Sequence, residues 1–197
     1  MALVTLFSTS VRAHTQGVSL ANVSIDEGGS ARLELGLATA EVNRIVPIDK
    51  DGDGQVSGQE LAKAHDSLAK ILPGTFDVVA DGKRCKPTFD AAKLAEPSDG
   101  LDIVVRYTCP PRPRDVTFRS HLAPAMVPGH RLVSTLSSST RTQSRVLTSN
   151  EPECMLHTEW DGDSKTGART QYAVAAAIIG GLAIVYAWGR KRASKPG

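Results

Sequence analysis

Alternation between apolar and polar residues is the clearest pattern in the first part of the chain. Three leucines occupy every second position of the segment 31–37, and the segment 18–25 alternates more loosely. A period of two places the apolar side chains of a strand on one face. The acidic, glycine-containing stretch 26–29 between the two segments favours a turn, so residues 18–37 are predicted to form a β-hairpin.

Six later segments are expected to be further strands, because most of them are rich in β-branched residues and bounded by turn residues. They are 76–80, 83–86, 101–109, 115–120, 131–136 and 145–148. The last two are expected to pair across the polar loop 137–144. Several short strands separated by turns indicate a mainly β fold, and we expect a β-sandwich for the body of the protein.

A helical pattern interrupts the strands between residues 39 and 72. Within 60–72 apolar residues recur at the spacing of one helix face; they are Leu61, Ala64, Leu68 and Ile71, with Leu72 beside them. Pro73 and Gly74 are expected to end this helix. The segment before it, 38–46, is short, because Pro47 should break any helix there.

Between these two helical segments lies the sequence 49–60, DKDGDGQVSGQE, which has the pattern of the twelve-residue calcium loop of an EF-hand. Acidic residues stand at its first, third, fifth and twelfth positions, and Gly54 stands at the sixth, where the loop turns sharply. The expected Ca²⁺ ligands are Asp49, Asp51, Asp53, Gln55 through its backbone carbonyl, Ser57 directly or through water, and Glu60. The segment 39–72 is therefore predicted to be an abbreviated EF-hand.

Two alternatives to calcium stay open for this loop. Mg²⁺ is one, although six to eight oxygen ligands suit Ca²⁺ better, and an acidic, glycine-rich turn without metal is the other. EF-hands usually pair, and the sequence contains no second matching loop. We therefore expect weak affinity and a structural role, as is common outside cells, rather than a large opening switch.

Composition and charge narrow the class of protein. Hydrophobic residues make up 41% of the 197 residues and charged residues 22%, proportions typical of a globular protein rather than a disordered one. The 23 Lys and Arg residues barely exceed the 21 Asp and Glu residues, and five of these bases lie within the first 13 and the last eight residues. A broad basic face for nucleic acid is therefore not expected.

Both ends of the chain have the character of membrane-targeting segments. The apolar N-terminus with a small residue at Ala13 is typical of the end of a secretory signal peptide, predicted here as 1–13. Near the other end, the 20 residues from 170 to 189 carry no charge, and about 20 helical residues match the thickness of a bilayer. A transmembrane helix is predicted at 171–189, and the basic tail 190–197 should stay in the cytoplasm.

These ends predict a single-pass protein of the cell membrane. Its body, 14–160, would lie outside the cytoplasm, in the periplasm, and a polar linker at 161–170 would precede the helix. Other interpretations stay open. The N-terminus has the alternative of an apolar strand, and the C-terminal segment has the alternatives of a buried core helix or a processed sorting tail.

The cysteines and histidines add candidate chemistry. Cys85 and Cys109 lie on predicted strands that could be neighbours, and a disulfide between them is expected in an oxidising compartment. Cys154 is left over, and it is free, paired between chains or paired in place of one of the others. Cleavage after Ala13 would make His14 the mature N-terminus, whose amine and imidazole can bind copper or nickel. The other histidines have no metal-ligand spacing.

The order of these features resembles a known family. Ala13 and His14 after the signal, the strand pair, the loop 49–60 with its helix, ADGKRC at 80–85 and VVRYTCP at 104–110 resemble the extracytoplasmic N-terminal domain of HupE/UreJ-type bacterial membrane proteins. The resemblance covers roughly residues 13 to 150 and implies that ectodomain fold with its calcium loop. Those proteins continue into a multi-helix membrane domain associated with the transport of nickel or related metals. A single apolar helix is predicted here, so the transport activity is not implied.

The sequence contains no nucleophile elbow, no phosphate-binding loop and no histidine–carboxylate motif, so an enzyme is not expected. It predicts a membrane-anchored, extracytoplasmic calcium-binding domain that is structural or binds a protein partner. The alternative is an accessory metal-handling protein that binds Ni²⁺ or Cu²⁺ at His14 and delivers the ion to a transporter. Replacing His14 separates the two, because it abolishes transition-metal binding only in the second.

Overall fold

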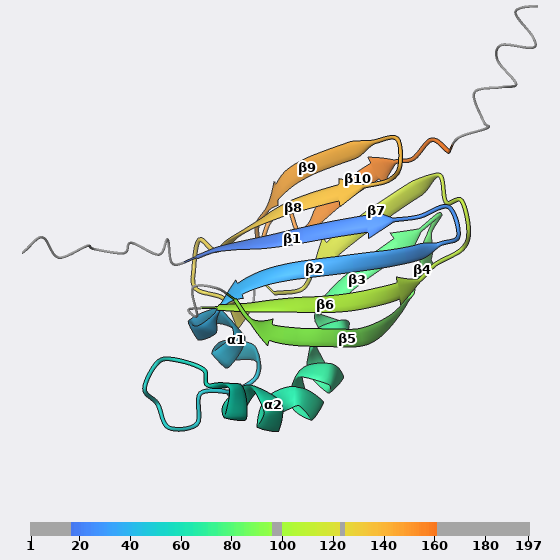
Figure 1. The fold of residues 1–197 in the computed structure, drawn as a ribbon. Helices are drawn as coiled ribbons and strands as arrows, with labels where there is room; N and C mark the ends of the chain where they lie inside the picture. Colours follow the sequence, from blue (N-terminus) through green and yellow to red (C-terminus); the bar gives the residue numbers. More distant parts are fainter. Residues whose placement is uncertain (1–16, 96–99, 123–124, 161–197) are drawn as a thin grey trace, which may run out of the picture. The chain divides into compact units, whose positions relative to one another are not determined.

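The computed structural model describes residues 17–95, 100–122 and 125–160, and nearly half of these residues belong to the strands of two β-sheets (Figure 1). The strands are β1 Val18–Ile25, β2 Ser30–Ala38, β3 Phe76–Ala80, β4 Lys83–Arg84, β5 Lys86–Leu94, β6 Gly100–Thr108, β7 Asp115–Ser120, β8 Arg131–Ser137, β9 Thr142–Leu147 and β10 Glu153–His157. The six-stranded sheet has the order β5-β6-β2-β1-β8-β9, and the four-stranded sheet has the order β10-β7-β3-β4. The fold is therefore mainly β, as the sequence predicts.

The predicted hairpin forms with the expected faces. Strands β1 and β2 pair antiparallel, with Val23 opposite Leu33, and the alternating leucines of β2 are buried. On its other side β1 pairs with β8, and this pairing is parallel, with Leu20 opposite Val133. Two segments more than 100 residues apart in the chain therefore lie side by side, a juxtaposition that no local pattern predicts.

The core lies between the two sheets. In the six-stranded sheet, Leu101 and Ile103 of β6 are fully buried, and in the four-stranded sheet Phe118 of β7 is fully buried. The hydroxyl of Tyr107 in β6 donates a hydrogen bond to the carbonyl of Phe76 in β3, at 3.4 Å, and so joins the sheets through their buried faces. Burial of apolar side chains from both sheets in one layer is the main stabilising term of the domain.

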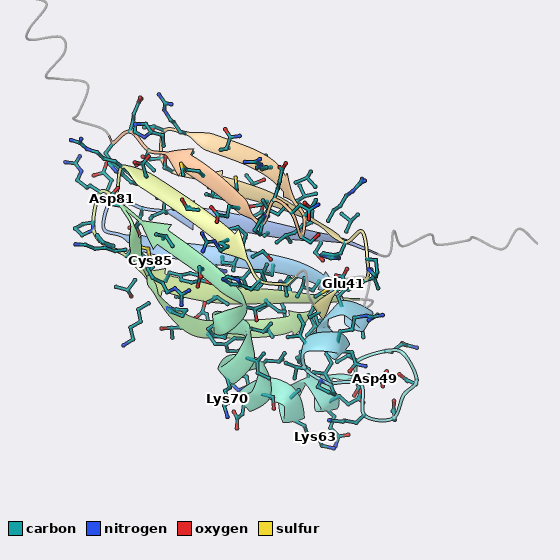
Figure 2. The ribbon with its side chains drawn as sticks, turned by 180° about the vertical axis from the view of Figure 1, so that it is seen from behind. Glu41, Asp49, Lys63, Lys70, Asp81 and Cys85 are labelled. Carbon is teal, nitrogen blue, oxygen red and sulfur yellow. A yellow bond between two sulfur atoms is a disulfide. The ribbon has the colours of Figure 1, made fainter. Side chains whose placement is uncertain are left out.

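A disulfide adds a covalent link between the same sheets. It joins Cys85, which follows β4, to Cys109, which follows β6, and Figure 2 labels Cys85 at this position. This is the pairing that the sequence analysis expects. The third cysteine, Cys154 in β10, is buried and free.

The helices lie together at one end of the sheets (Figure 1). They are α1 Thr39–Ile45, α2 Gly58–Ile71 and the 3₁₀ turn η1 Leu72–Thr75. They share one end because β2 runs directly into α1, and η1 runs directly into β3. The ring of His65 in α2 contacts the ring of Phe89 in β5 edge-on, with centroids 5.5 Å apart, and so fastens α2 to the edge strand.

The chain leaves the two sheets at the opposite end. Strand β10 pairs antiparallel with β7, and its last residue, His157, lies opposite Asp115, the first residue of β7. Strand β3 also pairs with β7, and its first residue, Phe76, lies opposite Ser120 at the far end of β7. Because η1 and α2 precede Phe76, the end of β10 and the helical end are separated by the length of β7.

Two strands are missing from the sequence-based prediction, and a third begins earlier than expected. Strand β5 is an exposed edge strand that contains Pro87, and a register shift between Phe89 and Ala91 interrupts its period of two. Strand β10 has five residues, of which only two are buried. Strand β9 begins at Thr142 rather than at residue 145, because its polar half pairs with β8 along the exposed edge of the sheet.

Ile71, which the sequence places near the apolar face of α2, is 41% exposed, whereas Leu72 is fully buried. The buried residues of α2 follow one another at a spacing of four, at Glu60, Ala64 and Leu68. Leu72 continues this row and Ile71 lies beside it.

Several predictions fall outside the described residues. They are the signal peptide 1–13, the linker 161–170, the transmembrane helix 171–189 and the tail 190–197. Within 17–95, 100–122 and 125–160, no helix is both long enough and apolar enough to cross a bilayer.

Candidate metal centre

The predicted calcium loop connects α1 to α2, and buried apolar residues hold both of its ends. Ile48, directly before the loop, is fully buried, and Val56, its eighth residue, is 4% exposed. The side-chain oxygen of Asn43 accepts hydrogen bonds from the backbone N–H groups of Ile48, at 2.8 Å, and Asp49, at 3.2 Å. The loop therefore leaves α1 in a fixed direction in spite of Pro47.

Three predicted ligands come together inside the loop. Asp49, Asp51 and Asp53 each offer a carboxylate oxygen, and these oxygens lie within 4.8 Å of one another. Asp49 is partly buried and the other two are exposed, and Figure 2 shows Asp49 beside the loop at the helical end. Three convergent carboxylates repel one another in water, so the arrangement favours a divalent cation with oxygen ligands.

Backbone N–H groups of the loop orient these carboxylates. Asp49 accepts through one oxygen from Gly52, at 2.7 Å, and through the other from Gly54, at 3.1 Å. Asp53 accepts from Gln55 at 2.8 Å. Gly54 has a φ of +81°, a left-handed conformation that glycine adopts at little cost, which agrees with its predicted role at the sharp turn.

The twelfth residue, Glu60, lies outside this group of oxygens. Its Oε1 accepts from the backbone N–H of Lys50 at 2.7 Å, and its Oε2 accepts from the backbone N–H of Ser57 at 3.0 Å. Hydrogen bonds from the backbone of Ser57, then from that of Lys50, lower the pKa of Glu60 from 4.5 to about 2. Glu60 is thus a charged, 9% exposed carboxylate that already reaches across to the start of the loop.

Ser57 and Glu60 together form the N-terminal cap of α2. The hydroxyl of Ser57 donates to Glu60 Oε2 at 2.9 Å and accepts from the backbone N–H of Glu60 at 3.2 Å. This reciprocal capping box satisfies N–H groups that an uncapped helix leaves free. Direct binding of Glu60 to a cation would require it to exchange its bonds to Ser57 for the ion. Gln55 is exposed, as expected of a residue that contributes only its backbone carbonyl.

Two residues that hold α1 and the start of the loop in position could not be predicted from the sequence. Asn43 is one, and the only local signal for it is an amide side chain near the end of the entering helix. Glu41 of α1 is the other. Its Oε2 accepts from the hydroxyl of Ser19 in β1, at 2.6 Å, and from the backbone N–H of Ala38, at 3.1 Å, so it fastens α1 to the sheet. Neither partner could be found from spacing along the chain.

The buried thiol of Cys154 and the buried phenol of Tyr107 both have raised pKa values. Burial raises the pKa of the Cys154 thiol and keeps it protonated and weakly nucleophilic at neutral pH. Burial likewise raises the pKa of Tyr107. Both groups therefore behave as packing residues.

Comparison with known proteins does not assign the chain to a family. No protein-family model matches it, and no curated protein matches it. The functional argument therefore rests on the residues of the site.

Proposed function

We propose that this chain is a membrane-anchored, extracytoplasmic calcium-binding domain without catalytic activity. It is a β-sandwich with an EF-hand inserted between β2 and β3, anchored by one C-terminal helix and exposed to the periplasm. The proposed Ca²⁺ ligands are Asp49, Asp51, Asp53, the backbone carbonyl of Gln55, Ser57 and Glu60.

The convergence of three carboxylates in one loop is the observation that supports this proposal most strongly. Asp49, Asp51 and Asp53 bring oxygens within 4.8 Å of one another. Ca²⁺ takes six to eight oxygen ligands in flexible geometry, which three aspartates, a carbonyl, a hydroxyl or water and a bidentate glutamate can supply. A site with fewer, rigid ligands would suit Mg²⁺ better.

Calcium would act by joining α1 to α2 through the loop. Glu60 lies in the first turn of α2, and the side chain of Asn43 holds the backbone of Asp49 against the end of α1. An ion held by both residues would fix the second helix relative to the first. Because it would bind the folded domain and not the unfolded chain, it would raise the free energy of unfolding by mass action.

A partner-binding role is supported by where the loop lies. The helical end carries the loop, and β10 ends at the other end of the sheets. The last described strand therefore ends away from the loop. Asp51 and Asp53 of the loop are exposed, so a protein partner can contact the loop at the helical end.

Calorimetric titration of the full chain in detergent micelles with Ca²⁺ tests the proposal. We expect one-site binding in the wild type and none in the Asp49→Ala variant. Asp66→Ala is the matched control, because Asp66 is a fully exposed acid of α2 outside the loop. Parallel titrations with Mg²⁺, Ni²⁺ and Cu²⁺ identify the preferred ion.

Two outcomes would contradict the proposal. One is an absence of Ca²⁺ binding, especially together with tight binding of Ni²⁺ or Cu²⁺. The other is a Ca²⁺ affinity that Asp49→Ala and Asp66→Ala leave equally unchanged, which would locate the ion elsewhere in the chain.

A further inference from the structure

Exposed apolar side chains gather on the outward face of the six-stranded sheet. Of the five large apolar side chains that are exposed among the described residues, three lie on this face: Val18 and Leu20 of β1, and Val146 of β9. Leu20 lies opposite Val133 of β8, which lies opposite Val146, so these side chains form one row across three neighbouring strands. In Figure 1 the described helices lie at one end of the sheets, and none crosses this face.

A dent opens beside Leu20 at the same level of the sheet. Its volume is about 280 Å³, and its lining includes Leu20, Gly36 of β2 and Asp102 of β6. Gly36 lies opposite both Leu20 and Asp102, so the dent arises where the row meets a residue without a side chain. Leu20 is 54% exposed at the edge of the dent. A projecting apolar side chain and a hollow therefore lie side by side on one face.

The fold itself does not require glycine at position 36. Both neighbouring strands pair with β2 through Gly36 without a register shift, which excludes a bulge. Its φ is not positive, and an added Cβ would meet only the Cβ of Leu20, at the ordinary contact distance of 3.8 Å. Glycine inside a strand weakens the strand and commonly marks a bulge, a bend or a place where another backbone or a ligand approaches closely. Close approach from outside the chain is the explanation that fits Gly36.

We propose that this face is the interface between two copies of the chain, in which Leu20 of each copy enters the dent beside Gly36 of the other. In a dimer with two-fold symmetry the same patch contacts itself, so a projecting side chain beside a hollow is self-complementary. The dent is smaller than small-molecule pockets, which measure roughly 300–1,000 Å³. Its size therefore favours a protein side chain over a small ligand.

The charges around the dent suit a second copy better than a strongly charged partner. Arg32 pairs with Glu34 at 2.9 Å, and Lys93 pairs with Asp102 at 3.4 Å. All four side chains line the dent. Two bases and two acids leave its rim without net charge, so a copy of the same face meets no net repulsion. Basic groups of one copy can lie against acidic groups of the other.

The face is large enough for such a contact. Its strands are six to nine residues long. Six strands of this length, about 4.8 Å apart and rising about 3.3 Å per residue, present a face on the order of 750 Å². Each partner in a standard protein–protein interface buries roughly 800 Å². The proposed interface shares no residue with the calcium loop, so it does not depend on calcium binding.

Sedimentation velocity of the full chain in detergent micelles, over a range of protein concentrations, tests the interface. We expect the wild type to form dimers. Leu20→Thr removes the projecting side chain and Gly36→Thr fills the dent. Each should raise the dissociation constant of the dimer on the order of 30-fold, as the loss of a central contact does. Met155→Thr is the matched control, because Met155 is 60% exposed on β10 of the other sheet, and it should leave the dimer unchanged.

Gly36→Thr also separates loss of the interface from loss of the fold. Threonine suits a strand better than glycine, so at concentrations where both proteins are monomeric the variant should resist urea at least as well as the wild type. If Gly36→Thr does not fold, Leu20→Thr decides. The proposal is overturned if the wild type is monomeric at every concentration, or if the folded variants dimerise as tightly as the wild type. A dimer that Met155→Thr weakens equally would also overturn it, because the association would not be specific to this face.

Discussion

The proposed calcium loop and the buried Glu41–His130 pair both adjoin α1, and they are built in opposite ways. The proposed ligands of the loop lie within twelve consecutive residues, Asp51 and Asp53 among them are exposed, and backbone N–H groups of the same loop orient the aspartates. Glu41 and His130 are 89 positions apart, are buried, and meet only because β1 and β8 pair in parallel beside α1.

The loop and the buried pair therefore affect the free energy of unfolding in different ways. Exposed carboxylates stay hydrated, so the empty loop carries mainly the repulsion among its aspartates. A buried charge loses its hydration and depends on its neighbours for compensation. The loop would therefore gain stability from a bound ion, whereas the buried pair is part of the framework that holds α1 in place.

The largest effect is expected from His130→Ala, measured with all metals chelated. Removing the imidazole leaves the buried carboxylate of Glu41 without its 3.1 Å contact, and a buried carboxylate that loses its partner costs about 3–5 kcal/mol in the free energy of unfolding. Urea denaturation measures the loss. His157→Ala, on the surface, should change stability by about 0.5 kcal/mol or less.

Asp53→Ala, measured in the same chelator, completes this comparison. It should change the free energy of unfolding by about 0.5 kcal/mol or less, because Asp53 is exposed. If His130→Ala proves as mild as Asp53→Ala, the buried pair is not part of the framework and the contrast between the two sites is wrong.

The second largest effect expected is stabilisation of the folded domain by Ca²⁺ bound to the loop. At a Ca²⁺ concentration 100-fold above the dissociation constant, binding to the folded state should raise the free energy of unfolding by about 2.7 kcal/mol. Urea denaturation with and without Ca²⁺ measures this increment. Asp53→Ala should abolish it and Asp66→Ala should retain it. An increment that survives in Asp53→Ala would remove the aspartates of the loop from the site.

A smaller effect is expected from Asn43→Ala, which touches neither the ion nor the buried pair. The variant loses the hydrogen bonds to the backbone of Ile48 and Asp49 that fix the entrance to the loop. We expect a Ca²⁺ affinity about tenfold lower, equivalent to about 1.4 kcal/mol, measured by calorimetry. Asn22→Ala, an exposed amide of β1, is the control. Equal affinities in both variants would mean that the entrance needs no such anchor.

The two sites also mark how far the sequence alone can predict this protein. The hairpin β1–β2 and strands β3, β6, β7 and β8 follow from alternation and turn residues, because these signals are local. The acidic cluster of the loop follows from spacing for the same reason. Strand β5 does not, because Pro87 and a register shift hide its period.

Contacts between segments that are distant in the sequence could not be predicted, because they depend on the order of the strands in the sheets. The parallel pairing of β1 with β8 brings His130 to α1, and no periodicity encodes which strands become neighbours. Nothing in the sequence around His130 therefore distinguishes it from the other histidines. The position of Glu60 is a different case: its spacing predicts a ligand, and the structure adds that its carboxylate also caps α2 through Ser57.

The smallest expected effect is a pH dependence of the free energy of unfolding that comes from Glu60, at the end of the loop. The pKa of Glu60 is about 2 in the folded domain against the ordinary 4.5. The unfolded chain therefore binds the proton first as the pH falls. The stabilisation from this carboxylate is complete above pH 4.5 and is lost progressively between pH 4.5 and 2. Glu60→Gln carries no charge to titrate and should lack this component.

Urea denaturation of both proteins between pH 6 and pH 2.5, in chelator, isolates the contribution of Glu60, because every other titrating group is common to the two. We expect the two free energies of unfolding to converge as the pH falls below about 4.5. Because no other residue changes, curves that stay parallel would mean that the capping hydrogen bonds from Ser57 and Lys50 do not favour the charged carboxylate. The N-terminal end of α2 would then be stable whether or not Glu60 is charged. The loop and the buried pair would then differ only in how deeply their side chains are buried.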